Sequence, residues 1–243
     1  MDRVDIIGVT FDNVTMEQAV SRAMELVESG KTAFIVTPNA EIAYDCIKNE
    51  TFCELINRAD LTIPDGAGIV LASKILKTPL KQKVAGVELA EALLPELAKR
   101  GKKLFLFGAK PGVAERAAEA MKKIAPELNI CGCMHGYFEN DNEVVEKINS
   151  SEADIVFVCL GSPKQEQWMY RNSDKLIPCT MMGLGGSLDV FAGEARRAPD
   201  LMIRMNLEWL YRLYKQPSRV GRMMRLPKYL LAAVCKSLKR AHK

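Results

Sequence analysis

Short apolar runs alternate with longer amphipathic segments along most of the sequence. The runs suit strands, and the segments between them repeat apolar residues every three or four positions, as one face of a helix requires. We predict strands at residues 5–11, 32–36, 60–63, 103–107, 129–133, 154–160 and 180–184. Helices are predicted from the capping box at Thr15 to about residue 29, once or twice between 40 and 59, and at 68–76, 86–100, 113–125 and 141–150, with one more after each of the last two strands.

This order predicts an α/β fold whose mainly parallel sheet is flanked by helices. Residues 154–160 are nearly all apolar, as is typical of a strand covered on both faces. In such folds the chemistry lies where strands end and helices begin. We see no internal repeat and no low-complexity linker.

The pattern changes after residue 195. Apolar residues recur at helical spacing from Leu201 to Tyr214, and we expect Pro217 and Pro227 to break the helices there. We therefore predict an α/β core at 1–195 and a basic, amphipathic helical appendage at 196–243. Such helices suit a bilayer interface, but they would also suit packing on the core with a solvated basic face, and the pattern favours neither.

Charge is also distributed unevenly between the two parts of the chain. Residues 196–243 hold 13 Lys and Arg against two acidic residues, a net +11, and the whole chain is +4, so residues 1–195 carry −7. The basic tail needs an anionic partner, which would be phospholipid, nucleic acid or a diphosphate. No signal peptide and no apolar stretch long enough to span a bilayer is recognisable among the 243 residues.

Metal-ligating residues are sparse. The seven cysteines are scattered, and we expect them to be buried, reduced thiols of a cytosolic protein, while two histidines make a histidine-rich site improbable. No Asp-x-Asp pair occurs, so the usual divalent-metal clamp of a nucleotide-sugar enzyme is missing. A diphosphate leaving group would then need side-chain cations, and the tail arginines are the natural supply.

Three glycine turns follow predicted strands and open helices, at residues 108–112, 161–165 and 183–187. Backbone N–H groups at such turns favour anions, although ordinary α/β turns have the same composition. None is a Walker loop. The dinucleotide fingerprint is also absent, and this argues against an oxidoreductase.

Asp65 lies between Pro64 and Gly66 at another strand-to-helix turn. A carboxylate there could take a proton from a sugar hydroxyl, or it could only cap the helix. Thr37 and Asn39, at a neighbouring turn, are either hydrogen-bond partners of a substrate or caps. Asp189 would contact a base or ribose, or cap the short helix after Ser187.

Several short motifs occur in order along nearly the whole chain. They are TPNAE at 37–41, PDGAG at 64–68, VAG at 84–86, FGAKPG at 107–112, GYF at 136–138, LGSPKQE at 160–166, GLGGSLD at 183–189, RAP at 197–199 and LEWLYR at 207–212. With these motifs the sequence resembles the WecG/TagA/CpsF family of glycosyltransferases. Within that family the resemblance is closest to the branch that makes the linkage unit of wall teichoic acid.

The resemblance implies an inverting, metal-independent enzyme with a Rossmann-like core and no cofactor besides its UDP-sugar substrate. It implies transfer of N-acetylmannosamine from UDP to the C4 hydroxyl of GlcNAc on undecaprenyl diphosphate, at the cytoplasmic face of the cell membrane. A relative's use of another UDP-sugar, for capsule or exopolysaccharide, is the alternative. The oligomeric state is left open.

The same resemblance assigns roles to residues. Asp65 is the candidate base, and Thr37, Asn39 and Gln165 line the sugar and acceptor pocket. The expected donor-binding residues are Gly108, Tyr137, Gly185, Gly186, Ser187 and Asp189, and the arginines lent by the appendage are Arg212, Arg219 and Arg222. Lys83 stands where many members have Arg, so the charge is kept but the bidentate fork is lost.

A module whose basic tail binds membrane or nucleic acid is the alternative from another class. The sequence carries no RNA- or zinc-finger-type signature that would support nucleic acid.

Overall fold

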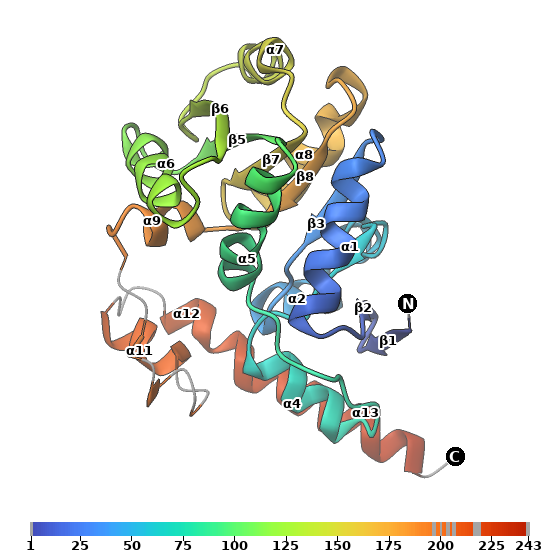
Figure 1. The fold of residues 1–243 in the computed structure, drawn as a ribbon. Helices are drawn as coiled ribbons and strands as arrows, with labels where there is room; N and C mark the ends of the chain where they lie inside the picture. Colours follow the sequence, from blue (N-terminus) through green and yellow to red (C-terminus); the bar gives the residue numbers. More distant parts are fainter. Residues whose placement is uncertain are drawn as a thin grey trace.

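The centre of the molecule is a six-stranded parallel sheet with strand order β4-β3-β8-β7-β5-β6 (Figure 1). The computed structural model describes residues 2–195, 198–199, 201–202, 205, 208–215 and 220–241. The strands are β3 (Ala33–Val36), β4 (Leu61–Thr62), β5 (Lys103–Gly108), β6 (Asn129–Met134), β7 (Ile155–Cys159) and β8 (Thr180–Gly183). The predicted α/β class with a mainly parallel sheet is confirmed.

Helices cover both faces of the sheet. One face packs against α1 (Met16–Glu28), α5 (Gly86–Lys99), α6 (Val113–Ile124) and α9 (Ser187–Phe191). The other packs against α2 (Ala40–Lys48), α3 (Glu50–Asn57), α7 (Asp141–Ser151) and α8 (Lys164–Asn172), with the short 3-10 helix η1 (Ser173–Lys175) after α8. The chain reverses direction across the sheet after β6, so α6 and α7 lie on opposite faces, as right-handed crossovers require.

The middle strands form the interior that the apolar pattern predicts. Every residue of β7 is buried, and Phe105 and Phe107 of β5 are wholly inaccessible to solvent. Burying one such side chain stabilises the fold by roughly 1.5–3 kcal/mol. These strands therefore hold their carboxyl ends in fixed positions for whatever binds there.

The first predicted strand is wrong in its form. Instead of one strand at 5–11, β1 (Arg3–Ile6) and β2 (Val9–Asp12) make an antiparallel hairpin outside the main sheet. Ile7 and Gly8 turn the chain with φ values of 56° and 93°. Positive φ at both central residues matches the twist of the two strands. Isoleucine rarely adopts such a φ, so the apolar run at 5–11 gave no indication of a turn at Ile7.

The last described helix, α13 (Arg225–Ala241), packs beside α2 and α4 (Ala67–Ile75) (Figure 1). Tyr229 is fully buried, and its hydroxyl donates a hydrogen bond of 3.3 Å to the carbonyl of Ile6. Lys236 makes an ion pair with Asp5 at 2.9 Å. One face of α13 therefore belongs to the body of the molecule, as the core-packing interpretation of the tail expects.

The opposite face of α13 is open to solvent. It carries three apolar side chains and two lysines: Lys228, Leu231, Val234, Leu238 and Lys239. Leu231 is 63% exposed. The helix thus joins a packed face to an amphipathic outer face.

Two shorter helices, α11 (Glu208–Lys215) and α12 (Val220–Met223), precede α13. Pro227 does not break a helix, contrary to our prediction, because it occupies the first turn of α13, where a backbone N–H has no intrahelical partner. Pro217 and the division at residue 195 lie at or beside residues outside the described part, so both stay predictions. None of the described helices is long and apolar enough to cross a membrane.

Candidate active site

The predicted site residues follow the carboxyl ends of the parallel strands, which all meet at one edge of the sheet. Across that edge the order is Asp65 after β4, Thr37 and Asn39 after β3, Gly185 to Asp189 after β8, Gln165 after β7, Gly108 at the end of β5 and Tyr137 after β6. Residues as distant in the sequence as Thr37 and Asp189 thereby lie along one edge, which is where open α/β sheets bind ligands.

The sheet has a topological switch point at this edge. After β5 the chain leaves through α6 toward β6, whereas after β7 it leaves through α8 toward β8, in the opposite direction. The crevice between the ends of β5 and β7 is the position at which such sheets receive nucleotides. The glycine turns at 108–112 and 161–165 border it.

Gly108 shapes this crevice through a close backbone approach. Its φ is 133°, and a Cβ there would lie 2.2 Å from the carbonyl oxygen of Cys159 at the end of β7. The N–H of Ala109 donates to the same oxygen at 3.1 Å. Only glycine fits, so the two strand ends stay together at the switch point.

Asp65 lies half-buried between β4 and α4, two positions before that helix begins. The N-cap residue of α4 is Gly66, with φ 85°, so Asp65 does not occupy the capping position that was its alternative role. The carbonyl of Pro64 accepts a hydrogen bond of 3.0 Å from the N–H of Val84. The corner is therefore fastened to the segment that carries Lys83.

Asn39 adjoins the Asp65 corner and caps a helix. Its Oδ1 accepts hydrogen bonds from the backbone N–H groups of Glu41 and Ile42, at 2.9 and 3.1 Å. A Cβ built on Gly66 would lie 3.8 Å from the Asn39 Cβ, in van der Waals contact. The capping alternative is thus correct for the oxygen, and a contact of Asn39 with a substrate stays a prediction.

Thr37 is buried at the end of β3, and its hydroxyl donates a hydrogen bond of 3.0 Å to the carbonyl of Gly183. Gln165 approaches the same strand end from α8 and is 2% exposed. The Gln165 Oε1 accepts a hydrogen bond of 2.8 Å from the N–H of Gly185. Thr37 and Gln165 therefore converge on the end of β8 from its two sides.

The remaining donor-binding candidates lie beyond β8 and β6. The Ser187 hydroxyl donates to the carbonyl of Leu184 at 2.7 Å, and a Cβ on Gly186 would lie 3.7 Å from the Asp189 Oδ2. Tyr137 is 66% exposed, with its ring available to a ligand and its N–H donating to His135 Nδ1 at 3.3 Å.

The arginine predictions fall where the side chains are not described. Arg212 lies on α11 and Arg222 on α12, with only their helices described, and Arg219 lies outside the described residues. Their roles stay predictions.

Sequence reasoning missed two groups at α8. Lys164 donates to the carbonyl of Gly136 at 3.2 Å and lies 4.7 Å from the Phe138 ring centroid, so it ties α8 to the turn after β6. Glu166 is 1% exposed, and burial raises its pKa above the ordinary value. The motif at 160–166 contains both, but a motif does not show which side chains point inward.

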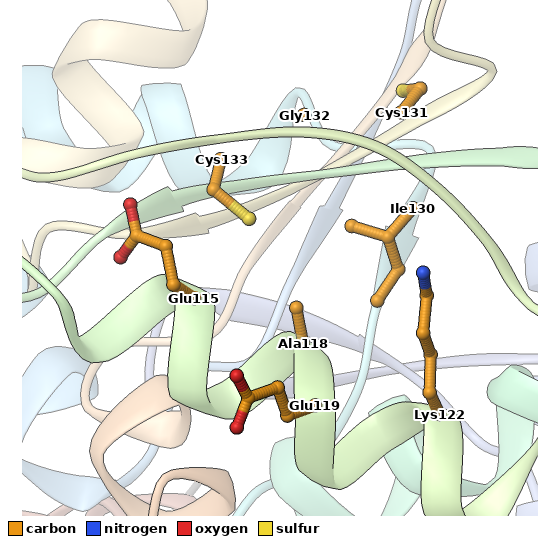
Figure 2. A pocket seen from close by; sticks show the side chains of 8 residues that line it. All are labelled: Glu115, Ala118, Glu119, Lys122, Ile130, Cys131, Gly132 and Cys133. Atoms are coloured by element: carbon orange, nitrogen blue, oxygen red, sulfur yellow. The ribbon is translucent and has the colours of Figure 1, made fainter.

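Figure 2 shows a hollow elsewhere, between α6 and the edge strand β6, lined by Glu115, Ala118, Glu119, Lys122 and residues 130–133. It lies along the side of β6 rather than at the carboxyl edge of the sheet, so it is separate from the candidate site.

All seven cysteines are free thiols, but only Cys46, Cys159 and Cys179 are buried and Cys235 is exposed, so the expectation of buried thiols is wrong in part. In the described part of the chain, no three His, Cys, Asp or Glu side chains gather closely enough to hold a metal ion.

Comparison with known proteins identifies the family to which the protein belongs. The sequence matches the glycosyl transferase WecG/TagA/CpsF family over residues 4–243. The protein belongs to this family of glycosyl transferases. Membership favours a glycosyltransferase over the oxidoreductase and binding-module alternatives, and it confirms the resemblance drawn from the motifs.

Curated members of the family are similar along nearly their whole length. A protein of Staphylococcus aureus (strain MW2) is 38% identical over 244 residues, covering 98% of this chain and 96% of its own. One of Bacillus spizizenii is 38% identical over 208 residues, covering 86% and 81%. Both are named N-acetylglucosaminyldiphosphoundecaprenol N-acetyl-beta-D-mannosaminyltransferase.

Proposed function

We propose that this family member transfers N-acetylmannosamine from UDP to the C4 hydroxyl of GlcNAc carried on undecaprenyl diphosphate. The acceptor and the transferred sugar are those named for relatives that are 38% identical. The observation that supports the chemistry is the closeness of Asn39 to Gly66, the residue after Asp65, next to the strand end that Thr37 and Gln165 contact.

The proposed reaction is a single displacement. Asp65 accepts the proton of the acceptor hydroxyl while that oxygen attacks the anomeric carbon from the face opposite the diphosphate. The new C–O bond forms as the bond to UDP breaks, and UDP leaves with the electron pair. One inversion turns an α-linked donor into a β-linked product, the linkage in the relatives' name.

The leaving diphosphate is proposed to be stabilised without a metal ion. The turn at 108–112 opens α6, whose N-terminus favours an anion at the switch point. Arg212, Arg219 and Arg222 would supply guanidinium groups, which bind phosphate oxygens in pairs. The absence of any Asp-x-Asp pair from the sequence supports stabilisation of the diphosphate by these groups instead of a metal ion.

The lipid acceptor requires the protein to work at a membrane surface. We assign that contact to the basic tail and to the outer face of α13, with its apolar and lysine side chains. A net charge of +11 after residue 195 suits an anionic cytoplasmic leaflet. The protein would then be peripheral to the membrane.

The donor sugar is the part of the proposal that most needs a test. UDP release is measured with a panel of UDP-sugars and a lipid-linked GlcNAc acceptor, with EDTA present. We expect turnover with UDP-N-acetylmannosamine at an unchanged rate in EDTA. Preference for UDP-glucose or another sugar would support the capsule or exopolysaccharide alternative, and loss of activity in EDTA would overturn the metal-free mechanism.

A further inference from the structure

Glu166 is a buried acid to which neither the motif nor the proposed mechanism gives a role. It lies in the first turn of α8 and is 1% exposed. A carboxyl group so far from solvent is costly to retain unless it makes a defined contact. Its position next to Gln165 indicates which contact that is.

The carboxyl group of Glu166 contacts the amide of Gln165. Its Oε1 accepts a hydrogen bond of 2.8 Å from Gln165 Nε2. Its Oε2 is buried without a hydrogen-bond partner among the described residues, and none of the ion pairs in that part of the chain includes Glu166. Burial raises the pKa of Glu166, while the hydrogen bond from Gln165 and the nearby Ser162 side chain act in the opposite direction.

The contact fixes which end of the Gln165 amide faces the sheet. With Nε2 held by Glu166, Oε1 is presented to the N–H of Gly185 and accepts from it at 2.8 Å. A flipped amide would set Nε2–H against that N–H and Oε1 against the Glu166 oxygen, so both hydrogen bonds would be lost. Glu166 thus removes the ambiguity that a side-chain amide otherwise has.

The fixed amide in turn holds the end of β8. A Cβ on Gly183 would lie 2.9 Å from Gln165 Nε2, so the amide packs directly on that strand end. The carbonyl of Gly183 accepts the hydrogen bond from Thr37 on the other side. The turn from Gly183 to Gly185 is therefore clamped between two candidate substrate-binding side chains.

We propose that Glu166 is a positioning residue, whose buried carboxyl group orients the Gln165 amide and thereby holds the turn after β8 in its substrate-binding shape. The inference rests on the proposed function for its effect on turnover, but its effect on Gly185 is independent of any substrate. Glu166 itself is buried and does not touch substrate.

The kinetic test compares variants of the full-length chain. Glu166→Ala is expected to lower kcat by about 10- to 100-fold, the range seen when an outer partner of a binding group is removed. Glu166→Gln keeps an acceptor oxygen for Gln165 in a side chain of the same shape, so it is expected to stay within about threefold of the parent. Gln167→Ala, at an exposed neighbouring position, is the matched control.

A double variant separates positioning from general damage. If Glu166 acts through Gln165, then Glu166→Ala costs little more in a Gln165→Ala background, and the two losses are far from multiplicative. Multiplicative losses would overturn the proposal, as would a Glu166→Gln variant as impaired as Glu166→Ala.

Hydrogen exchange supplies a readout without substrate. We expect the Gly185 amide to exchange at least tenfold faster in Glu166→Ala than in the parent, and at the parent rate in Glu166→Gln and Gln167→Ala, measured by NMR. If Glu166→Ala does not fold, Glu166→Met keeps the side-chain volume but offers Gln165 Nε2 no carboxyl oxygen, and it should speed Gly185 exchange equally. Unchanged exchange in the variant that folds overturns the proposal.

Absence of turnover in the parent with every UDP-sugar would instead contradict the proposed function.

Discussion

At the level of single residues, the largest predicted loss of activity comes from substituting Asp65, the proposed base. Asp65→Asn removes the proposed base while keeping the side-chain shape, so we expect UDP release to fall about 10²- to 10⁴-fold with folding unchanged. Asp174→Asn, at an exposed position in η1, is the control and should not alter the rate. Turnover by Asp65→Asn at the parent rate would falsify the assignment of the base.

Glu166 makes a prediction about stability and pH. Because burial raises its folded-state pKa above the ordinary value near 4.5, the unfolded chain releases this proton at lower pH than the folded one. Its favourable contribution is complete below pH 4.5 and is lost as pH rises through the folded pKa. The titratable neighbours Cys46 and Tyr170 also have pKa values raised by burial, so both are neutral across this window.

Glu166→Gln removes that titration. We expect the free energy of unfolding of the variant to increase relative to that of the parent as pH rises above 4.5, so that the variant becomes relatively more stable. Urea unfolding at several pH values measures the difference. A constant difference between pH 4 and 8 would contradict a raised pKa.

The location of the candidate residues at the carboxyl ends of the strands could be predicted from the sequence, but the orientations of their side chains could not. Asn39 and Gly66, the residue after Asp65, lie near each other because β3 and β4 pair in parallel, which the strand-helix order predicts. The direction of the Glu166 side chain depends on the packing of α8 against the sheet. A local motif holds no record of that packing.

At the level of secondary-structure elements, the junction of β5 and β7 tolerates no side chain at Gly108. Gly108→Ala combines a φ of 133° with a Cβ 2.2 Å from a carbonyl oxygen, so we expect a loss of about 3 kcal/mol or more in unfolding free energy. Gly101→Ala also has positive φ, 62°, but meets nothing within 4 Å, and should cost only about 1–2 kcal/mol. Equal losses in chemical denaturation would argue against the close approach.

The helix α13 can be tested for membership of the body. Tyr229→Ala should destabilise the protein by about 3–5 kcal/mol, since it empties a fully buried aromatic site. Leu231→Ala, on the exposed face of the same helix, should change stability by less than about 0.5 kcal/mol. A small effect of Tyr229→Ala on thermal unfolding would mean that α13 detaches without cost.

Elements with strong periodicity were predicted closely, and elements decided by tertiary contacts were not. The run at 154–160 gave β7 to within a residue or two at either end. The hairpin at β1 and β2 depended on a positive φ at Ile7, and the continuity of α13 through Pro227 depended on where the helix begins. Neither feature has a local signal in the hydrophobic pattern.

At the scale of the whole molecule, the opposition of an acidic body and a basic tail predicts an orientation on the membrane. We expect binding to vesicles containing phosphatidylglycerol to weaken as salt increases, because surface charge is screened. Replacing both Lys228 and Lys239 by Glu should weaken binding at least 30-fold, at about 1 kcal/mol for each lysine near the surface.

A charge-matched control separates position from net charge. Replacing Lys31 and Lys123, exposed on the body, by Glu changes the net charge equally and should weaken vesicle sedimentation far less. Equal weakening by the two double variants would mean that α13 does not face the bilayer.

The pairing of β3 with β8 has a consequence for how the enzyme comes into being. Thr37 and Gly183, joined by a hydrogen bond at the middle of the sheet, are 146 positions apart. Closing so large a loop is entropically unfavourable until most other contacts exist, so this seam is expected to be completed late in folding. Folding intermediates that lack the β3–β8 pair would also lack the proposed active-site edge. Partially folded protein is therefore expected to have no transferase activity.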